Sequence, residues 1–283
     1  MTRPHVEFIH EQVLPWSAGL PGDGRPGVSV RTLSLDEDTG GCSLVIRYPP
    51  GWERPQVEHL LADEEFFVVE GSLEIGGVAH DRLGYGFLPA GHVRRGARSP
   101  RGALVVTFFE EEPRPVPGEP AGATGATAAA AAGRDAVHVS ALEGEWTGNF
   151  HPLFPLGAGR KFLRQDPLTG EQTWILGTMP LRSGRRPEKH PVVEEMFLLS
   201  GELVGNLGVM HAGAYFWRPP EIWHGPYGSQ TGNLMLFRTR GGPLSTVYTE
   251  TEQDFDWRPA HRPILPPDLA GPGGTPYSGR APF

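Results

Sequence analysis

The chain has 283 residues, of which 38% are hydrophobic and 20% are charged, and its formal net charge at pH 7 is -8. This composition is typical of a globular protein long enough for two domains. The negative charge argues against nucleic acid as a partner, and no apolar run approaches the roughly 20 residues of a membrane helix. Cys42 is the single cysteine, so no internal disulfide can form, which fits a reducing compartment. We therefore expect a cytoplasmic protein.

Short apolar runs bounded by glycine and proline predict a series of strands in the first part of the chain. These runs are Ser43–Tyr48, Phe66–Val69, Tyr85–Leu88 and Ala103–Phe109. Residues 113–136 are rich in proline, alanine and glycine, and they predict a linker of low complexity.

A second series of apolar runs follows the linker. Its members are Thr173–Met179, Met196–Leu199, Ala214–Trp217, Leu234–Phe237 and Thr246–Tyr248. The proline- and glycine-rich tail, residues 258–283, should be extended and pack over a barrel or a neighbouring subunit. Many short strands predict an all-β fold, but alone they leave a jelly roll, a lipocalin-like barrel and an immunoglobulin-like sandwich open.

The two series repeat each other at an offset of 130 residues. Glu64-Glu65 corresponds to Glu194-Glu195, Gly71 to Gly201 and Pro89 to Pro219. A period of this length is too large for a solenoid unit, so it predicts two related domains of ordinary size. We place them at residues 1–112 and 137–257.

The second repeat carries a set of residues that could hold a metal ion. Glu188 and His190 lie two apart on a predicted strand and therefore share one face. Glu194 opens the next strand on the inner face, and His224 follows thirty residues later. Two imidazoles and one or two carboxylates on neighbouring strands form a compact site for a divalent ion.

Both repeats resemble the cupin superfamily over roughly residues 28–110 and 161–248. The family's first motif is a glycine, five residues, His-x-His, three or four residues, Glu, six residues and a glycine; its second is a glycine, five residues, Pro-x-Gly, two residues and a histidine. His190, Glu194 and Gly201 match the first motif, and Gly213, Pro219 and His224 match the second, with Glu221 where glycine is usual. The resemblance implies two tandem cupin barrels, which are double-stranded β-helices of the jelly-roll type.

One position departs from the family pattern, because Glu188 stands where the first metal-binding histidine is usual. Glu188 could ligate the ion, act as a catalytic acid or base, or hydrogen-bond a bound water. The remaining two-histidine, one-carboxylate set suits non-haem iron(II), and a second carboxylate favours iron(II) or manganese(II) over copper. Zinc(II) is an alternative.

The first repeat has Val57, His59, Glu64 and Arg94 at the corresponding positions. Valine cannot coordinate a metal and arginine keeps its proton. We therefore expect a first barrel without a metal, in which Arg94 and Glu64 form an ion pair. His92 is a possible substitute ligand.

Several side chains near the second motif are candidates for binding a substrate. Tyr215, Trp217 and Trp223, together with Trp174, could line a pocket for a planar or apolar molecule, although such aromatic residues are more often core. Arg218 could anchor a substrate carboxylate or face solvent.

The resemblance implies a metal-dependent enzyme acting on a small, oxygen-rich organic molecule that chelates the ion. We favour a non-haem iron(II) oxygenase. A non-redox manganese or zinc hydrolase, lyase or isomerase, with Glu188 as acid or base, is the first alternative; a Glu-x-His pair also occurs in the ureidoglycine aminohydrolases. A non-catalytic sensory cupin, similar to the barrels of certain anti-sigma factors, is the second. Cupins commonly associate through sheet edges, so we expect a homodimer.

Overall fold

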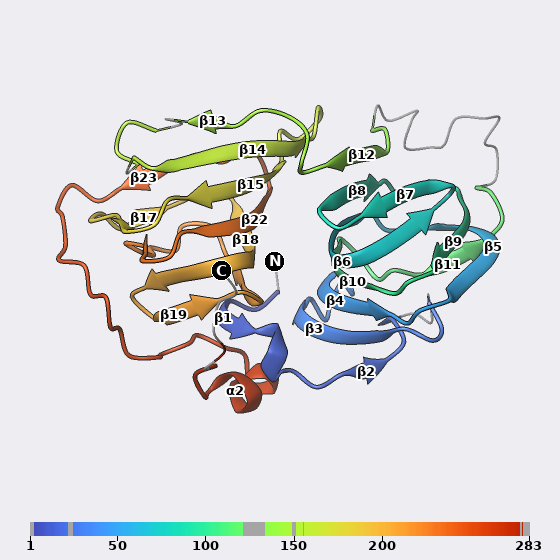
Figure 1. Cartoon of the computed structure of the whole chain (residues 1–283), viewed down its shortest axis with the longest axis horizontal. Helices are drawn as coiled ribbons and strands as arrows, with labels where there is room; N and C mark the ends of the chain where they lie inside the picture. The colour runs from blue at the N-terminus through green and yellow to red at the C-terminus, as the bar shows by residue number, and fades with distance from the viewer. Residues whose placement is uncertain are drawn as a thin grey trace. The chain divides into compact units, whose positions relative to one another are not determined.

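The computed structural model describes residues 3–21, 25–120, 134–148, 151–154, 156–277 and 279. The chain divides into two compact units. The first comprises Met1–Arg3 and Pro15–Glu143, and the second comprises Pro4–Leu14 and Gly144–Phe283. Each unit is built around its own antiparallel sheet (Figure 1).

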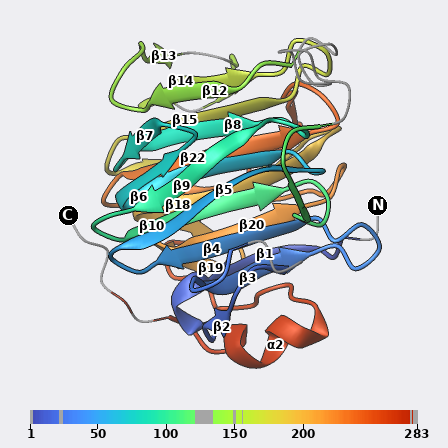
Figure 2. The same ribbon diagram turned by 90° about the vertical axis from the view of Figure 1, so that its right-hand side faces the viewer.

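The first unit is an eleven-stranded sheet in which β11, β5, β9, β6, β10, β4, β3 and β2 are neighbours in that order. Two further strands attach to β6, namely β7 and β8, and β12 pairs with β8. Figure 2 shows the strands of this sheet from a second side. The bounds are β2 Ser17–Ala18, β3 Ser29–Leu35, β4 Cys42–Tyr48, β5 Trp52–Leu60, β6 Glu64–Ile75, β7 Val78–Asp81, β8 Gly84–Leu88, β9 Arg94–Ser99, β10 Ala103–Phe109, β11 Pro115–Pro117 and β12 Val137–Ser140.

The second unit has a ten-stranded sheet with the order β1, β20, β18, β22, β15, β14 and β13, to which β19, β21 and β16 attach. A separate two-stranded sheet joins β17 to β23. The bounds are β1 Val6–His10, β13 Thr147–Gly148, β14 Ala158–Gln165, β15 Gln172–Thr178, β16 Arg182–Ser183, β17 Glu188–Lys189, β18 Val193–Gly205, β19 Gly208–His211, β20 Ala214–Arg218, β21 Gly228–Ser229, β22 Asn233–Arg240 and β23 Val247–Tyr248. Among the described residues of this unit there are also two short helices, the 3-10 helix η1 (Glu11–Val13) and α2 (Pro267–Gly273).

The prediction of an all-β fold with two tandem jelly-roll barrels is confirmed. Every apolar run predicted to be extended overlaps a strand, and each of the two units has its own large antiparallel sheet. Each unit also has its own apolar core. The first core gathers residues such as Tyr48, Phe66 and Val105, and the second gathers residues such as Trp174, Met196 and Phe237.

The repeated glycines mark the same close approach in both units. Gly71 and Gly201 have φ angles of 73° and 78°, a left-handed conformation that residues other than glycine rarely adopt. A Cβ atom on either would lie 2.0 Å from a carbonyl oxygen, that of Gly102 or Gly232. Glycine is therefore required where β6 meets β10 and where β18 meets β22.

The two repeats exchange their first strands. β1 pairs with β20 of the second unit, placing Val6 opposite Trp217 and His10 opposite Ala214. β12, which lies 130 residues after β1, pairs with β8 of the first unit, and β8 is the repeat counterpart of β20. Each barrel is thus completed by the strand that precedes the other barrel's core in the sequence.

This exchange changes the domain boundaries expected from sequence. A first domain of residues 1–112 would contain β1, and a second domain of 137–257 would contain β12, but the structure assigns both the other way. The predicted linker lies partly in residues 121–133, outside the described residues. The predicted tail, residues 258–283, belongs to the second unit, where Ile264 forms two backbone hydrogen bonds with Glu7.

Candidate metal centre

The backbone of the second unit brings Glu188 and His224 side by side. Glu188 begins the two-residue strand β17, which pairs with β23. The backbone of Glu188 also exchanges two 2.9 Å hydrogen bonds with that of His224, so the two residues form an isolated bridge. His190 follows β17 directly, and Glu194 lies at the start of β18. Four residues predicted as ligands therefore come from three adjoining segments.

Both histidines have one ring nitrogen fixed by a backbone carbonyl. Nδ1 of His190 lies 2.9 Å from the oxygen of Ser245, and Nδ1 of His224 lies 2.9 Å from that of Ile222. A carbonyl only accepts hydrogen bonds, so each Nδ1 carries the proton and each Nε2 presents a lone pair. This is the arrangement that orients histidines bound to metals.

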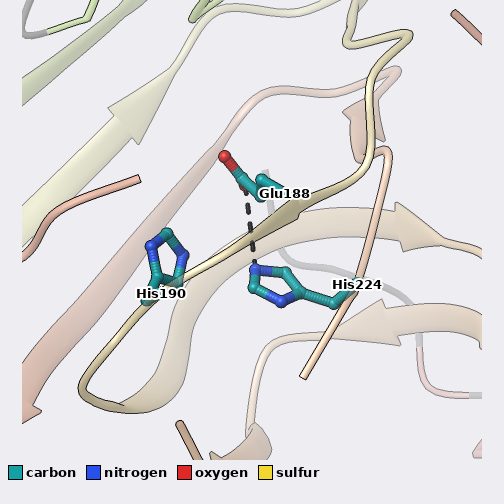
Figure 3. A group of neighbouring side chains, drawn as sticks. All are labelled: Glu188, His190 and His224. Carbon is teal, nitrogen blue, oxygen red and sulfur yellow. Dashed lines mark ion pairs between the residues drawn. The ribbon is translucent and has the colours of Figure 1, made fainter. Parts of the chain in front are cut away.

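The two Nε2 atoms point into the site. Both are buried, and neither has a hydrogen-bond partner among the described residues. Buried polar atoms rarely lack a hydrogen-bond partner. The two Nε2 atoms therefore indicate that a ligand binds here. Figure 3 shows the two rings and Glu188 gathered around one point.

Two carboxylates complete the group. Glu188, His190 and His224 each offer an atom within 4.8 Å of the others, and Glu188 Oε1 lies 4.0 Å from His224 Nε2. Glu194 directs Oε1 to 3.6 Å from His190 Nε2 and Oε2 to 3.6 Å from His224 Nε2. Such separations fit groups that share one ion at about 2.0–2.2 Å each. The donor set of imidazole and carboxylate therefore fits iron(II), manganese(II) or zinc(II).

Burial and nearby charges shift the pKa values of His224 and Glu188 in opposite directions. Burial lowers the pKa of His224 well below its usual 6.5, and the charge of Arg218 adds to this effect. The neutral ring that results is the form that binds metals. Burial raises the pKa of Glu188 above 4.5, and the negative charge of Glu194 raises it further. The charge of His190 and a hydrogen bond with Tyr248 lower the pKa of Glu188, but burial outweighs them.

A cavity of about 80 Å³ opens beside the metal-binding group. That volume holds several water molecules or a small organic compound. Its walls are mainly apolar, and polar groups gather at one end. The residues that line it include Trp174, Leu176, Phe216, Met235 and Phe237, with Arg160, Arg182, Glu188, His190, Glu194, Tyr227 and Tyr248.

None of the four residues proposed from sequence to bind substrate lines this cavity. Tyr215 is fully buried on the opposite face of β20, where its hydroxyl donates to Glu195, and Trp217 shares that face. Trp223 is 47% exposed, with the ammonium of Lys189 5.2 Å from its ring. Of the aromatic residues considered from sequence, Trp174 alone is a wall of the cavity.

Arg218 is buried rather than exposed to substrate or solvent. Its guanidinium donates to Glu7 at 2.9 Å through Nε, again to Glu7 through Nη2, and to Glu194 Oε2 through Nη1. Tyr227 accepts a further hydrogen bond from it at 2.7 Å. Sequence reasoning missed Glu7 and Tyr227, and no spacing connects Glu7 with a residue 211 positions away.

The corresponding position of the first barrel holds an ion-pair network. Arg94 donates to Glu64 at 2.9 Å, as predicted, and Arg25 donates to both oxygens of the same carboxylate at 2.6 Å. His59 directs Nδ1 toward the carbonyl of Gly118, and Val57 is partly exposed. Within the described ranges, the group around Glu188 is the single one of its kind.

The backbone at Glu221 retains the conformation of the glycine that is usual there. Its φ angle is 66°, in the left-handed region that favours glycine. Its carboxylate accepts a hydrogen bond from Lys189, the residue between Glu188 and His190. The departure from the motif therefore changes the side chain without changing the turn.

Two solved structures illustrate what the fold of this chain is similar to. A protein from Nostoc punctiforme described as a "putative dioxygenase" is 19% identical, with a TM-score of 0.73 over 90% of this chain and 88% of that one. Oxalate decarboxylase from Bacillus subtilis is 12% identical, with a TM-score of 0.53 over 85% and 78%. Mn(II) centres are described for the latter enzyme. At these identities the likeness shows the fold alone, an all-β fold of the jelly-roll type.

No curated protein matches the sequence of this chain. None of the described helices is long and apolar enough to cross a membrane. A family model matches residues 6–245, a span that starts at β1 and ends between β22 and β23. The chain therefore belongs to the family described as a domain of unknown function, DUF4437.

Proposed function

We propose that this protein is a metal-dependent enzyme that acts on a small, oxygen-rich organic substrate in the second barrel, and that its reaction is an iron(II)-dependent oxygenation. The proposal rests on one observation above all. The Nε2 atoms of His190 and His224 are buried beside a cavity and have no hydrogen-bond partner among the described residues. Glu188 forms a compact group with both histidines, and Glu194 has an oxygen 3.6 Å from each Nε2.

His190, His224 and Glu194 would hold the ion. When bound, the metal would supply Lewis acidity and, as iron(II), a centre that reacts with dioxygen. Arg218 occupies Oε2 of Glu194, which leaves Oε1 directed at His190 and the metal position. Three protein ligands leave coordination positions open for a substrate.

The cavity supports a small substrate with both apolar and anionic parts. Trp174, Phe216 and Phe237 offer apolar walls, which keep water from the reacting atoms. The guanidinium groups of Arg160 and Arg182 lie along the same cavity and favour a carboxylate or another oxygen-rich group. A volume of about 80 Å³ favours a small substrate.

A specific observation favours a second candidate, a non-redox manganese or zinc enzyme. Glu188 has a raised pKa and hydrogen-bonds the hydroxyl of Tyr248 at the wall of the cavity. A carboxyl group with a pKa closer to neutrality can move a proton to or from a substrate. Glu188 would then be the catalytic acid or base, whichever metal is bound.

The two candidates differ in their need for dioxygen. Metal-free protein is loaded with iron(II), manganese(II) or zinc(II) and given a panel of small hydroxy, oxo and carboxylic acids in an oxygen electrode. The oxygenase predicts oxygen consumption with iron(II) that is lost in His190→Ala. Turnover that persists in anaerobic buffer with manganese(II) would show the oxygenase assignment to be wrong.

The Glu188→Ala variant separates the two roles of that residue. If Glu188 is a ligand, the variant loses metal. If Glu188 moves a proton, the variant retains metal and loses turnover. Elemental analysis of protein purified without added metal, measured together with the rate, distinguishes these results.

A further inference from the structure

We propose that Glu7, on the exchanged strand β1, is a positioning residue of the metal site in the second barrel, where it acts through Arg218 on Glu194. This inference rests on the proposed metal site. It assigns a functional role to the N-terminal segment, which lies a whole barrel away from the site in the sequence.

Glu7 and Arg218 form a bidentate pair inside the second unit. Arg218 Nε donates to Glu7 Oε2 at 2.9 Å, and Nη2 donates to Oε1. The Tyr227 hydroxyl accepts from Arg218 at 2.7 Å and donates to Glu7 Oε1 at 3.0 Å. The side chains of Glu7 and Arg218 are 4% and 1% exposed, so water screens their charges little.

The third hydrogen-bonding nitrogen of Arg218 extends this pair to the metal site. Nη1 donates to Oε2 of Glu194, while Oε1 of Glu194 faces His190. One guanidinium therefore lies between two carboxylates, and the three groups together carry a charge of about -1. A net negative charge suits a divalent cation, and the fixed Oε2 determines where Oε1 points.

The backbone holds Glu7 in place on both sides. β1 pairs with β20, the strand that carries Arg218, and Glu7 lies opposite Phe216. The amide of Glu7 donates to Ile264 at 2.7 Å, and the amide of Ile264 donates back at 2.5 Å. The carboxylate is thus presented by a paired strand, which fixes a site better than a free loop does.

Removing the charge of Glu7 would strengthen the electrostatic attraction between Arg218 and Glu194. With a neutral side chain at position 7, Glu194 is the one carboxylate that still pairs with the guanidinium of Arg218. The positive charge of Arg218 then acts on Glu194 alone and competes more strongly with a metal ion for it. The charge of the three groups rises from about -1 to 0. Both changes weaken the hold of Glu194 on a cation, and changes of this kind typically cost about 10- to 100-fold in metal affinity.

The first barrel supplies a matched control. Glu64 is a fully buried carboxylate that accepts hydrogen bonds from two arginines, Arg25 and Arg94. Glu64→Gln removes a buried charge of the same type from the other unit. It is expected to lower stability while leaving metal affinity unchanged, so it separates loss of folding from loss of positioning.

The experiment is a titration of metal-free, full-length protein with manganese(II), in which the free ion is followed by electron paramagnetic resonance. Wild type, Glu7→Gln and Glu64→Gln are compared, and thermal unfolding without metal is recorded for each. We expect wild type and Glu64→Gln to bind equally, and Glu7→Gln to bind about 10- to 100-fold more weakly. A Glu7→Gln protein that binds as wild type does overturns the inference.

Two further outcomes concern a wild-type protein that binds no metal and a Glu7→Gln variant that does not fold. If wild type binds no manganese(II), iron(II) or zinc(II), the proposed function fails and this inference fails with it. If Glu7→Gln does not fold, Glu7→Asp keeps the negative charge at position 7 but withdraws the carboxylate from Arg218, whose bond to Glu194 is left in place. That variant is expected to fold and to bind more weakly than wild type, and wild-type affinity in it overturns the inference.

Discussion

At the scale of single residues, the candidate site depends on which nitrogen of each histidine faces the centre. The carbonyls of Ser245 and Ile222 fix Nδ1 of His190 and His224, so the orientation of each ring is set before any ion binds. A site fixed in this way needs little rearrangement to accept a metal.

The first prediction concerns these two histidines. His190→Ala and His224→Ala should each lower metal affinity by more than about 100-fold, because a lost ligand costs more than a lost partner of a ligand. His59→Ala, at the repeat position of the first barrel, should bind metal as wild type does. Isothermal titration of metal-free protein measures all three, and an unchanged affinity in either of the first two variants would contradict the assignment.

Residue spacing predicted the four groups that converge, but it did not predict the residues around them. Motif positions fix which residues of a strand face inward, so Glu188, His190, Glu194 and His224 could be identified. Arg218 has the same inward parity as Phe216, and the sequence gives no sign that Glu7 neutralises it. Buried ion pairs between distant segments leave no periodic signal.

A second prediction at this scale concerns pH. Burial lowers the pKa of His10 from 6.5 to about 3, with contributions from His211 and His261, and its Nε2 accepts the amide of His211 at 2.9 Å. Between pH 6.5 and about 3 the unfolded chain binds a proton that the folded chain does not, so stability falls as the pH falls through this range. His10→Gln should lose less stability between pH 7 and pH 4 than wild type, measured by urea unfolding. An identical pH dependence in both proteins would contradict this account.

At the scale of elements, β1 ties the start of the chain to the sheet of the second unit. It closes one edge of the sheet through β20, and it contributes Phe8 to the core and Glu7 to the buried network. The strands predicted from sequence include neither β1 nor β12, so the sequence pattern could not say which barrel each of these edge strands joins. The choice of partner depends on contacts between residues that are distant in the chain.

The third prediction concerns Phe8. Its side chain is 1% exposed and lies in the same core cluster as Phe216 and Met210. Phe8→Ala should lower the free energy of unfolding by about 3–5 kcal/mol. Urea denaturation followed by tryptophan fluorescence measures the change, because Trp174 lies in the same core cluster as Phe8. A loss below about 1 kcal/mol would show that β1 does not belong to the folded core.

At the scale of the whole chain, the exchange of first strands makes each barrel depend on a segment from the other half of the sequence. A fragment cut at the sequence-based boundary, residues 137–283, would contain the unpaired strand β12 and lack β1. Exposed edges and uncovered apolar residues promote aggregation.

The fourth prediction follows from this exchange. The fragment 137–283 should be poorly soluble or unfolded, whereas a chain that joins residues 4–14 to residues 144–283 should fold. Circular dichroism and size-exclusion chromatography compare the two. A well-folded 137–283 fragment with cooperative unfolding would contradict the assignment of β1 to the second barrel.

The most direct test of the whole account is an X-ray structure of full-length protein loaded with iron(II) or manganese(II), with anomalous data collected at the metal edge. We predict one ion per chain, bound by Nε2 of His190, Nε2 of His224 and a glutamate oxygen at roughly 2.0–2.3 Å, and none beside His59. An empty second barrel in which these groups turn away from one another, or a metal bound in the first barrel alone, would contradict the central claim.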